Sequence, residues 1–371
     1  METATVVCVL GMHRSGTSAV ARVLSLLGVD LGPPQRLFGP RADNPEGFLE
    51  HMGFVEVSEE ILARLGGCWH EPPAFVPGWE RASALLDLRM RAAALIREDF
   101  SGRALWGWKD PRACLTLPFW QTLLPPTRYV LCIRSPLSVA RSLQERDGFS
   151  IEKSGRLWLT HVTSALTHTA GNPRLIVAYE DVLTARDQEV QRLARFVGRP
   201  DLAEVRSAIR ESLRHDLQHH RASLEDTVTE RRLLLPARAL YAQLHLAVSH
   251  HRDSSKEMDE EDEVLTLLAR VSGEDQAADF EAQHRHLLAD HHRLALEREQ
   301  LRTDVTRLQS DLTSLQSHLA RSQEALAEVQ GHPVWRAYHW LRSGLLPGGS
   351  RREVAYLRTR RWLEARRRTD R

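Results

Sequence analysis

The first half of the chain alternates short apolar segments with amphipathic helical patterns. Residues 3–10 form a β-branched apolar run that predicts a buried strand, followed by a glycine-bounded loop at residues 11–16. Further strands are predicted at residues 104–108, 128–133 and 175–178. Helical patterns occupy residues 52–65, 81–100, 151–169 and 184–196. This alternation predicts an α/β fold, a P-loop-like parallel sheet flanked by helices.

Charged motifs follow three of the predicted strands. They are the loop at residues 11–17, the segment at residues 109–112, and Arg134, which precedes a helix that starts at Pro136. The carboxyl ends of parallel strands meet at one edge of a sheet, and ligands bind there. We therefore expect these three motifs to share one site.

Beyond Pro200 the patterns are purely helical. Leucine recurs every seven residues, with a second apolar row between: Leu287, Leu294, Leu301, Leu308 and Leu315, then Val305, Leu312, Leu319 and Leu326. Such heptads predict a long C-terminal coiled-coil helix that pairs with another copy or another coiled coil; a solitary amphipathic helix is the alternative. The expected division is an α/β domain (1–200), its helical extension (201–252), an acidic linker with a short helix (253–279), the coiled coil (280–330) and a basic aromatic tail (331–371).

Composition limits the function classes. The formal charge of +1 gives no general sign of nucleic-acid binding, although residues 331–371 hold eleven Arg against three acidic residues, a net of +8. Arginine interleaved with tryptophan and tyrosine predicts contact with an anionic membrane surface; an acidic protein partner is the alternative. The four cysteines have no metal-ligand or redox spacing, and we see no signal peptide and no membrane-spanning run. We therefore expect a cytoplasmic protein, peripheral at the inner membrane surface through its tail.

The loop Gly11-Met12-His13-Arg14-Ser15-Gly16-Thr17-Ser18 carries the main chemical signal. Its small residues allow backbone N–H groups to converge on a phosphate at a helix N-terminus, and Arg14 adds a full charge. A nucleoside-triphosphatase loop would have lysine where Thr17 stands, which weakens a kinase-like reading. A tight turn that binds nothing is a further alternative.

These residues resemble the sulfotransferases that use PAPS (3′-phosphoadenosine 5′-phosphosulfate). Residues 11–18 resemble their 5′-phosphosulfate loop, and Arg134 with Ser142 resembles their 3′-phosphate motif. Lys109-Asp110-Pro111 is similar to a segment of tyrosylprotein and bacterial sulfotransferases, and residues 179–181 also resemble the bacterial branch. The resemblance spans about residues 6–200 and leaves out the heptads and the tail.

The resemblance implies transfer of a sulfuryl group from PAPS to a hydroxyl or amine acceptor, without a metal. Donor binding is then expected from Gly11, His13, Arg14, Ser15, Gly16, Thr17, Ser18, Arg134 and Ser142. Lys109 is one of only three lysines and is the candidate for stabilising the bridging oxygen. A glycan, a lipid or a small metabolite would serve as acceptor.

The general base has three candidates, because an acceptor hydroxyl must lose its proton as the new bond forms. Glu46 and Glu50 lie in a segment that resembles the N-P-x-G-x-x-E stretch of bacterial members, and we favour Glu50. Asp110 is the third candidate, with a supporting role beside Lys109 or Arg112 as its alternative. Two other functions stay open: a nonenzymatic nucleotide-binding coiled-coil scaffold, and a P-loop kinase-like phosphotransferase.

Overall fold

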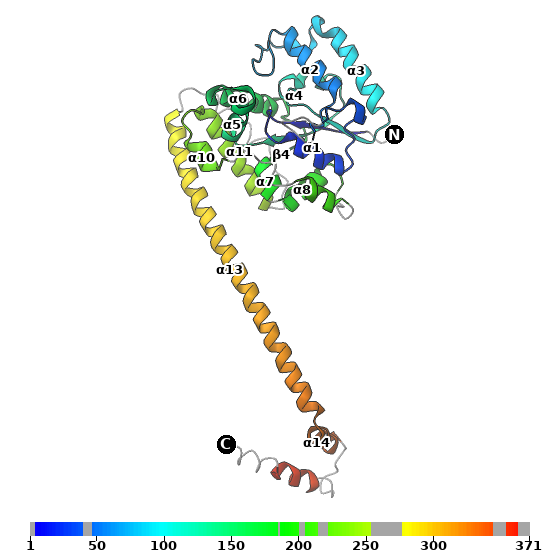
Figure 1. Ribbon diagram of the computed structural model, residues 1–371, viewed down its shortest axis with the longest axis vertical. Helices are drawn as coiled ribbons and strands as arrows, with labels where there is room; N and C mark the ends of the chain where they lie inside the picture. The colour runs from blue at the N-terminus through cyan, green and yellow to red at the C-terminus, as the bar shows by residue number, and fades with distance from the viewer. Residues whose placement is uncertain are drawn as a thin grey trace. The chain divides into compact units, whose positions relative to one another are not determined.

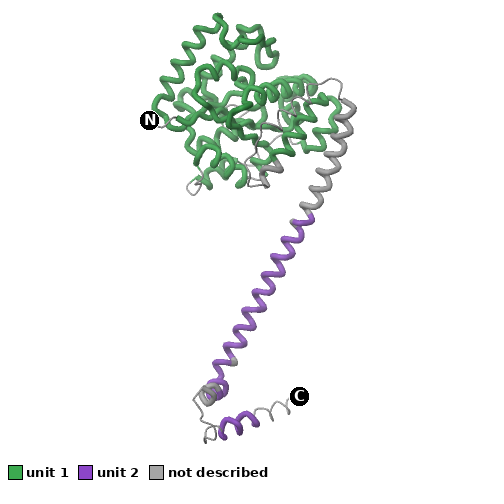
Figure 2. The backbone as a smooth tube through the Cα atoms, turned by 180° about the vertical axis from the view of Figure 1, so that it is seen from behind, with its two compact units in different colours: residues 1–285 green, residues 286–371 purple. Residues whose placement is uncertain are grey.

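The computed structural model describes residues 4–39, 47–184, 186–199, 205–213, 222–253, 277–343 and 354–362. The chain divides into two compact units, Met1–Arg285 and His286–Arg371 (Figure 2). Unit 1 holds the sheet and the helices packed against it, and unit 2 is helical where it is described.

Unit 1 is built on a four-stranded parallel sheet with the order β2-β1-β3-β4. The strands are β1 (Thr5–Leu10), β2 (Leu105–Lys109), β3 (Thr127–Ile133) and β4 (Arg174–Ala178). The central strand β1 pairs Val9 with Lys109 on one side and Leu10 with Leu131 on the other. The predicted parallel sheet is confirmed, and its carboxyl edge collects the ends of β1, β2 and β3.

Helices cover both faces of the sheet (Figure 1). Around the sheet lie α1 (Thr17–Leu26), α2 (Met52–Arg64), α3 (Leu86–Phe100), α4 (Ala113–Gln121), α5 (Pro136–Asp147), α6 (Ile151–His168), α7 (Tyr179–Thr184), α8 (Arg186–Phe196), α9 (Arg206–Ser212), α10 (Leu224–Thr229) and α11 (Leu235–Asp253). Short 3₁₀ turns lie at Pro34–Arg36, Trp79–Arg81 and Ser83–Leu85.

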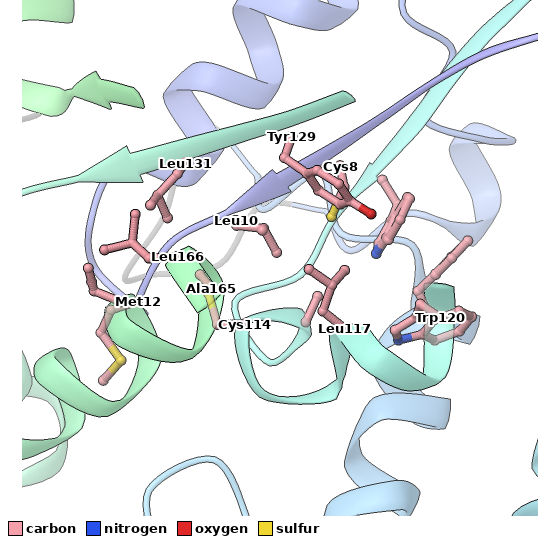
Figure 3. Packing of buried hydrophobic residues seen from close by; sticks show 14 of the residues in the cluster. Cys8, Leu10, Met12, Cys114, Leu117, Trp120, Tyr129, Leu131, Ala165 and Leu166 are labelled. Atoms are coloured by element: carbon pink, nitrogen blue, oxygen red, sulfur yellow. The ribbon is translucent and has the colours of Figure 1, made fainter. Parts of the chain in front are cut away.

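The core has two parts because alternate residues of β1 point to opposite faces. Cys8 and Leu10 join one cluster with Leu117, Trp120 and side chains of α2, α3 and α6 (Figure 3). Val7 and Val9 join the other cluster, with apolar residues of α1, α7, α8 and α9. The continuous apolar run of β1 thus reflects burial on both faces.

The helix expected at residues 184–196 is confirmed as α8, which begins at Arg186 and ends at Phe196. The short helix α7 before it was not predicted. The backbone enters α7 directly at Tyr179, the residue after β4. The acidic linker falls mostly outside the described residues, since 254–276 are not among them.

Unit 2 contains the long predicted helix. Helix α13 (Ala277–Gly331) enters this unit and is followed by α14 (Pro333–Ser343) and a helix at residues 354–362. The predicted long helix is confirmed. Its described heptad side chains are exposed, so pairing of this helix with another stays a prediction. Among the residues described, no helix is both long and apolar enough to cross a membrane.

Candidate active site

The loop after β1 turns sharply to start helix α1. Arg14 and Gly16 both have left-handed backbone conformations, with φ of 69° and 86°. A Cβ atom on Gly16 would lie 2.0 Å from the ring of Tyr179, so only glycine fits there. No side chain caps the N-terminus of α1, whose first N–H groups have no acceptor within the helix. These features are typical of an anion site.

The two arginines predicted for the donor support each other. Arg134 donates a hydrogen bond of 2.9 Å to the carbonyl oxygen of Arg14. The Nε of Arg14 donates to the hydroxyl of Ser142 at 2.8 Å. Ser142, which the sequence pairs with Arg134, accepts this bond and so brings α5 against the loop. The Arg134 guanidinium also lies 5.0 Å from the ring centroid of Tyr179.

Lys109 ends β2 and connects the loop to the predicted base. Its side chain is 1% exposed, and its Nζ donates to Glu50 Oε1 at 2.5 Å and to the Ser18 hydroxyl at 3.3 Å. Burial lowers the pKa of the Lys109 ammonium, and the Glu50 carboxylate opposes that shift. Lys109 therefore contacts both the helix that carries the phosphate loop and the candidate base.

Backbone geometry at Leu49 directs the Glu50 side chain toward Lys109. Leu49 has a φ of 53°, an uncommon left-handed conformation for a residue with a Cβ. The adjacent chain is fixed by Phe38, whose N–H donates to the Glu50 carbonyl, and by Ser18, whose hydroxyl donates to the Phe48 carbonyl. Glu46, the other candidate in this segment, lies outside the described residues.

Asp110 lies behind the site and contacts Arg112. The Asp110 Oδ1 accepts from the Arg112 backbone at 3.0 Å and from its guanidinium at 3.1 Å. Burial raises the pKa of Asp110, and Arg112 opposes the shift. Arg112 also reaches Glu59 at 2.7 Å and Glu50 at 3.8 Å. Asp110 thus orients Arg112 and does not line the cleft.

A cleft of about 640 Å³ opens at this edge of the sheet. Of the predicted site residues it is lined by His13, Arg14, Gly16, Thr17, Ser18, Glu50, Lys109 and Arg134. Ser142 contacts the cleft residue Arg14 from behind, whereas Gly11 and Ser15 support the loop from within. The Gly11 N–H donates to the Cys114 sulfur, and the Ser15 carbonyl accepts from the Cys132 thiol.

Several lining residues were not predicted. They are Arg22, Phe48 and Arg146, together with the acidic residues Glu56, Glu59 and Asp147. Arg22 could have been found, because it lies four residues after Ser18 on the same helix face.

Other lining residues lie in segments that the sequence had indicated. Arg112 belongs to the charged segment 109–112, and Tyr179 to the segment 179–181. Phe38 and Trp69 come from the irregular loops at residues 32–47 and 68–80, from which the acceptor pocket was expected.

His13 is held against Trp69 at the side of the cleft. The two ring centroids are 4.2 Å apart, and the Arg146 guanidinium lies 5.6 Å from the centroid of Trp69. Burial lowers the pKa of His13 well below its usual value, and the nearby positive charges of Arg112 and Arg146 add to that shift. Burial thus favours the neutral imidazole, which packs on Trp69 beside the cleft, and contact of His13 with the donor stays a prediction.

One group of potential metal ligands lies beside the cleft. Cys68, His70 and Glu71 place ligand atoms within 4.8 Å of one another. Glu71 is exposed and also pairs with Lys153 at 3.7 Å. The group was not predicted from the sequence, and it takes no part in the contacts of Lys109 or Glu50.

The part of the chain that forms this cleft is similar to proteins of a known family. A model described as "Sulfotransferase family" matches residues 7–204. No curated protein matches the chain. Solved structures similar to it include the sulfotransferase domain from the Synechococcus PCC 7002 olefin synthase, at 15% identity and a TM-score of 0.38, covering 72% of this chain and 95% of that chain.

Two further structures are similar over large parts of their length. The sulfotransferase domain from the curacin biosynthetic pathway has 14% identity and a TM-score of 0.35, with 74% of this chain and 99% of that chain covered. Retinol dehydratase in complex with androsterone and inactive cofactor PAP has 15% identity and a TM-score of 0.32, with 58% and 66% covered.

Proposed function

The chain belongs to the sulfotransferase family, and on this premise we propose that it moves a sulfuryl group from PAPS to a hydroxyl or amine acceptor by in-line, metal-independent transfer. The observation that carries the proposal is that Arg14, Lys109 and Arg134 line one cleft beyond the ends of β1, β2 and β3. PAPS is anionic at its 5′ and 3′ positions, so a pocket for it needs two separated groups of cations. The volume of the cleft is in the usual range for such a ligand.

In this proposal the phosphate loop and the N-terminus of α1 bind the 5′-phosphosulfate. Arg14 supplies the charge there, while Arg134 binds the 3′-phosphate. Because Arg134 also holds the Arg14 carbonyl, the two subsites keep a fixed separation. Ser142 then positions the Arg14 guanidinium through its 2.8 Å hydrogen bond.

The transfer step uses Lys109 and Glu50. The acceptor oxygen or nitrogen forms a bond to sulfur while the bond from sulfur to the bridging 5′-phosphate oxygen breaks, which releases PAP (3′-phosphoadenosine 5′-phosphate). Lys109 neutralises the charge that develops on that leaving oxygen. The acceptor proton passes to Glu50, whose carboxylate lines the cleft. Asp110 is a positioning residue, because it acts through Arg112.

Calorimetry tests the donor site. PAP should bind without magnesium and more tightly than ATP, and Arg14→Ala and Arg134→Ala should each weaken PAP by at least about tenfold through loss of charge-assisted hydrogen bonds. Arg210→Ala is the control, because Arg210 pairs with Asp187 outside the cleft. Unchanged affinity in both cleft variants would remove the site assignment, and magnesium-dependent ATP binding would favour a kinase-like phosphotransferase.

A labelled-PAPS assay tests the activity itself. Label should pass from PAPS to a glycan, lipid or small metabolite in lysate fractions, in the presence of EDTA. The Glu50→Gln variant should bind PAP but transfer little label. Tight PAP binding with no transfer by the unmodified chain to any fraction would favour a nonenzymatic nucleotide-binding scaffold.

For the tail we propose contact of a cytoplasmic protein with an anionic membrane surface. Val334, Trp335, Leu357 and Trp362 are at least 37% exposed, and Arg358 shares a helix with the last two. Exposed apolar and aromatic groups beside arginine suit the membrane interface. Vesicles that contain phosphatidylserine should co-sediment the chain, and neutral vesicles should not. Equal sedimentation with both would contradict this proposal.

A further inference from the structure

One face of α13 carries a long row of exposed apolar side chains. Between 52% and 66% of each is exposed: Leu301, Val305, Leu308, Leu312, Leu315, Leu319 and Leu326. From Leu301 to Leu319 their spacing alternates between four and three residues, which places them at positions d and a of a heptad. Leu326 follows at the next a position, with Ser322 at the d position between. A row of this kind is one half of an interface, because burial of its leucines requires a facing helix with the same period.

We propose that this row binds the same row of a second copy of the chain, forming a parallel two-stranded coiled coil. This interface is independent of the proposed transfer chemistry, so either can fail alone.

The core positions favour two strands. Position d is occupied by leucine at Leu301, Leu308 and Leu315, whereas trimers and tetramers favour isoleucine there. Position a carries Val305 and then leucine, but the sequence puts Arg298 one heptad earlier. His291 also stands at an a position, two heptads before Val305. Pairing in register sets each of these polar residues against its own copy, whereas a slip by one heptad would set Arg298 against the apolar Val305.

The charges beside the row favour the parallel orientation. The g positions of four successive heptads are acidic: Asp290, Glu297, Asp304 and Asp311. The e positions are basic or neutral: Arg302, Gln309, Gln316 and Gln323. In an antiparallel pair the g rows face each other, which would set acid against acid. In a parallel pair each g residue faces an e residue of the second copy, so Glu297 meets Arg302.

The charges at positions g and e also favour a second copy of this chain, rather than an unrelated helix, as the partner of α13. A g row that is acidic and an e row that begins with Arg302 complement each other within one sequence, with no need for a partner of different charge. Parallel pairing also brings the two copies of α14 to the same end, because Pro333 follows the end of α13 at Gly331. Two basic aromatic tails at one end would bind a membrane surface with higher avidity than one.

The oligomeric state of the full chain, measured by light scattering after size-exclusion chromatography, tests the interface. The unmodified chain should have the mass of a dimer. Leu308→Asp with Leu315→Asp should give a monomer, because it puts four carboxylates into the apolar row of the pair. Ser310→Asp with Ser317→Asp is the matched control, since both serines are at the outward f position, and it should stay dimeric. A monomeric unmodified chain, a trimer, or a dimeric leucine variant would overturn the proposal.

Disulfide trapping tests the orientation and does not depend on a destabilised variant. Leu326→Cys lies near one end of the row, so mild oxidation should join two copies only if residue 326 faces residue 326. The unmodified chain, with its own four cysteines, is the background control. If the Leu326→Cys variant is dimeric by mass but forms no cross-link beyond the background, the parallel arrangement is overturned.

Discussion

The buried ion pair between Lys109 and Glu50 allows a quantitative test of the site. Lys109→Met removes the ammonium and keeps most of the apolar stem. It leaves the Glu50 carboxylate buried, with Arg112 at 3.8 Å as its remaining cation. Breaking a buried pair on one side destabilises a protein by about 3–5 kcal/mol. Because Arg112 remains, we expect a loss near the lower end, about 3 kcal/mol in the free energy of unfolding.

The double variant separates the pair from its surroundings. Glu50→Gln alone removes the negative charge beside the buried Lys109 ammonium, which keeps its contact with the Ser18 hydroxyl, so this variant should also be destabilising. When both substitutions are combined, neither charge is left uncompensated. The combined loss should therefore be smaller than the sum of the single losses by at least about 1.5 kcal/mol, which is a typical coupling for groups in contact.

Urea unfolding followed by tryptophan fluorescence measures these losses. Six of the nine tryptophans lie within residues 1–285, so the signal mainly reports unit 1. Lys153→Met is the control, because the Lys153 side chain is 38% exposed and its ion pair with Glu71 is 3.7 Å long. That variant should lose less than about 1 kcal/mol. Additive losses for Lys109 and Glu50, or a Lys109 loss no larger than the control, would refute the buried pair.

Two further predictions follow from the loop and its surroundings. Gly16→Ala should weaken PAP binding and should destabilise unit 1 by more than the control Gly148→Ala does. Both positions have a positive φ, but only a Cβ at position 16 would lie against Tyr179. Equal losses of the two variants in urea unfolding would contradict this. Burial lowers the pKa of His161 to about 4, so between pH 6.5 and pH 4 the unfolded state binds more protons than the folded state. The free energy of unfolding should therefore decrease as the pH is lowered through this range, by up to about 3 kcal/mol. His161→Gln should flatten this part of the pH profile, and an unchanged slope would rule out His161 as its source.

The sheet could be predicted because its signals are local. Each strand is a short apolar run buried on both faces, and the structure places all four within one or two residues of their predicted bounds. Helix α7 was missed because Tyr179–Thr184 packs through tertiary contacts and carries too few residues to show a helical period. Helix α13 could be predicted because its heptad pattern is also a local feature of the sequence.

The approximate position of the site could also be predicted, since the ends of parallel strands meet at one edge whatever the side chains are. What could not be predicted is which groups touch. Cys114 is 103 residues from Gly11, and its sulfur accepts the hydrogen bond of the first loop N–H. The hydrogen bond from Arg14 to Ser142 likewise joins residues that are 128 positions apart. Such contacts depend on rotamers and on the packing of α4 and α5, which no residue pattern encodes.

Glu50 illustrates how a single backbone conformation can bring a candidate base to its partner. The sequence favoured Glu50 over Glu46, which lies outside the described residues, and Asp110 was adjacent to Lys109 itself. The left-handed turn at Leu49 directs Glu50 to the Lys109 ammonium, while Asp110 is turned back to Arg112. The Lys109 ammonium would then respond to charge on both sides of the reacting sulfur: to the leaving oxygen, and to the carboxylate that receives the acceptor proton. Neutralisation of Glu50 by that proton would free Lys109 to interact with the leaving oxygen as its charge develops, so the pairing in the resting site suits a concerted transfer.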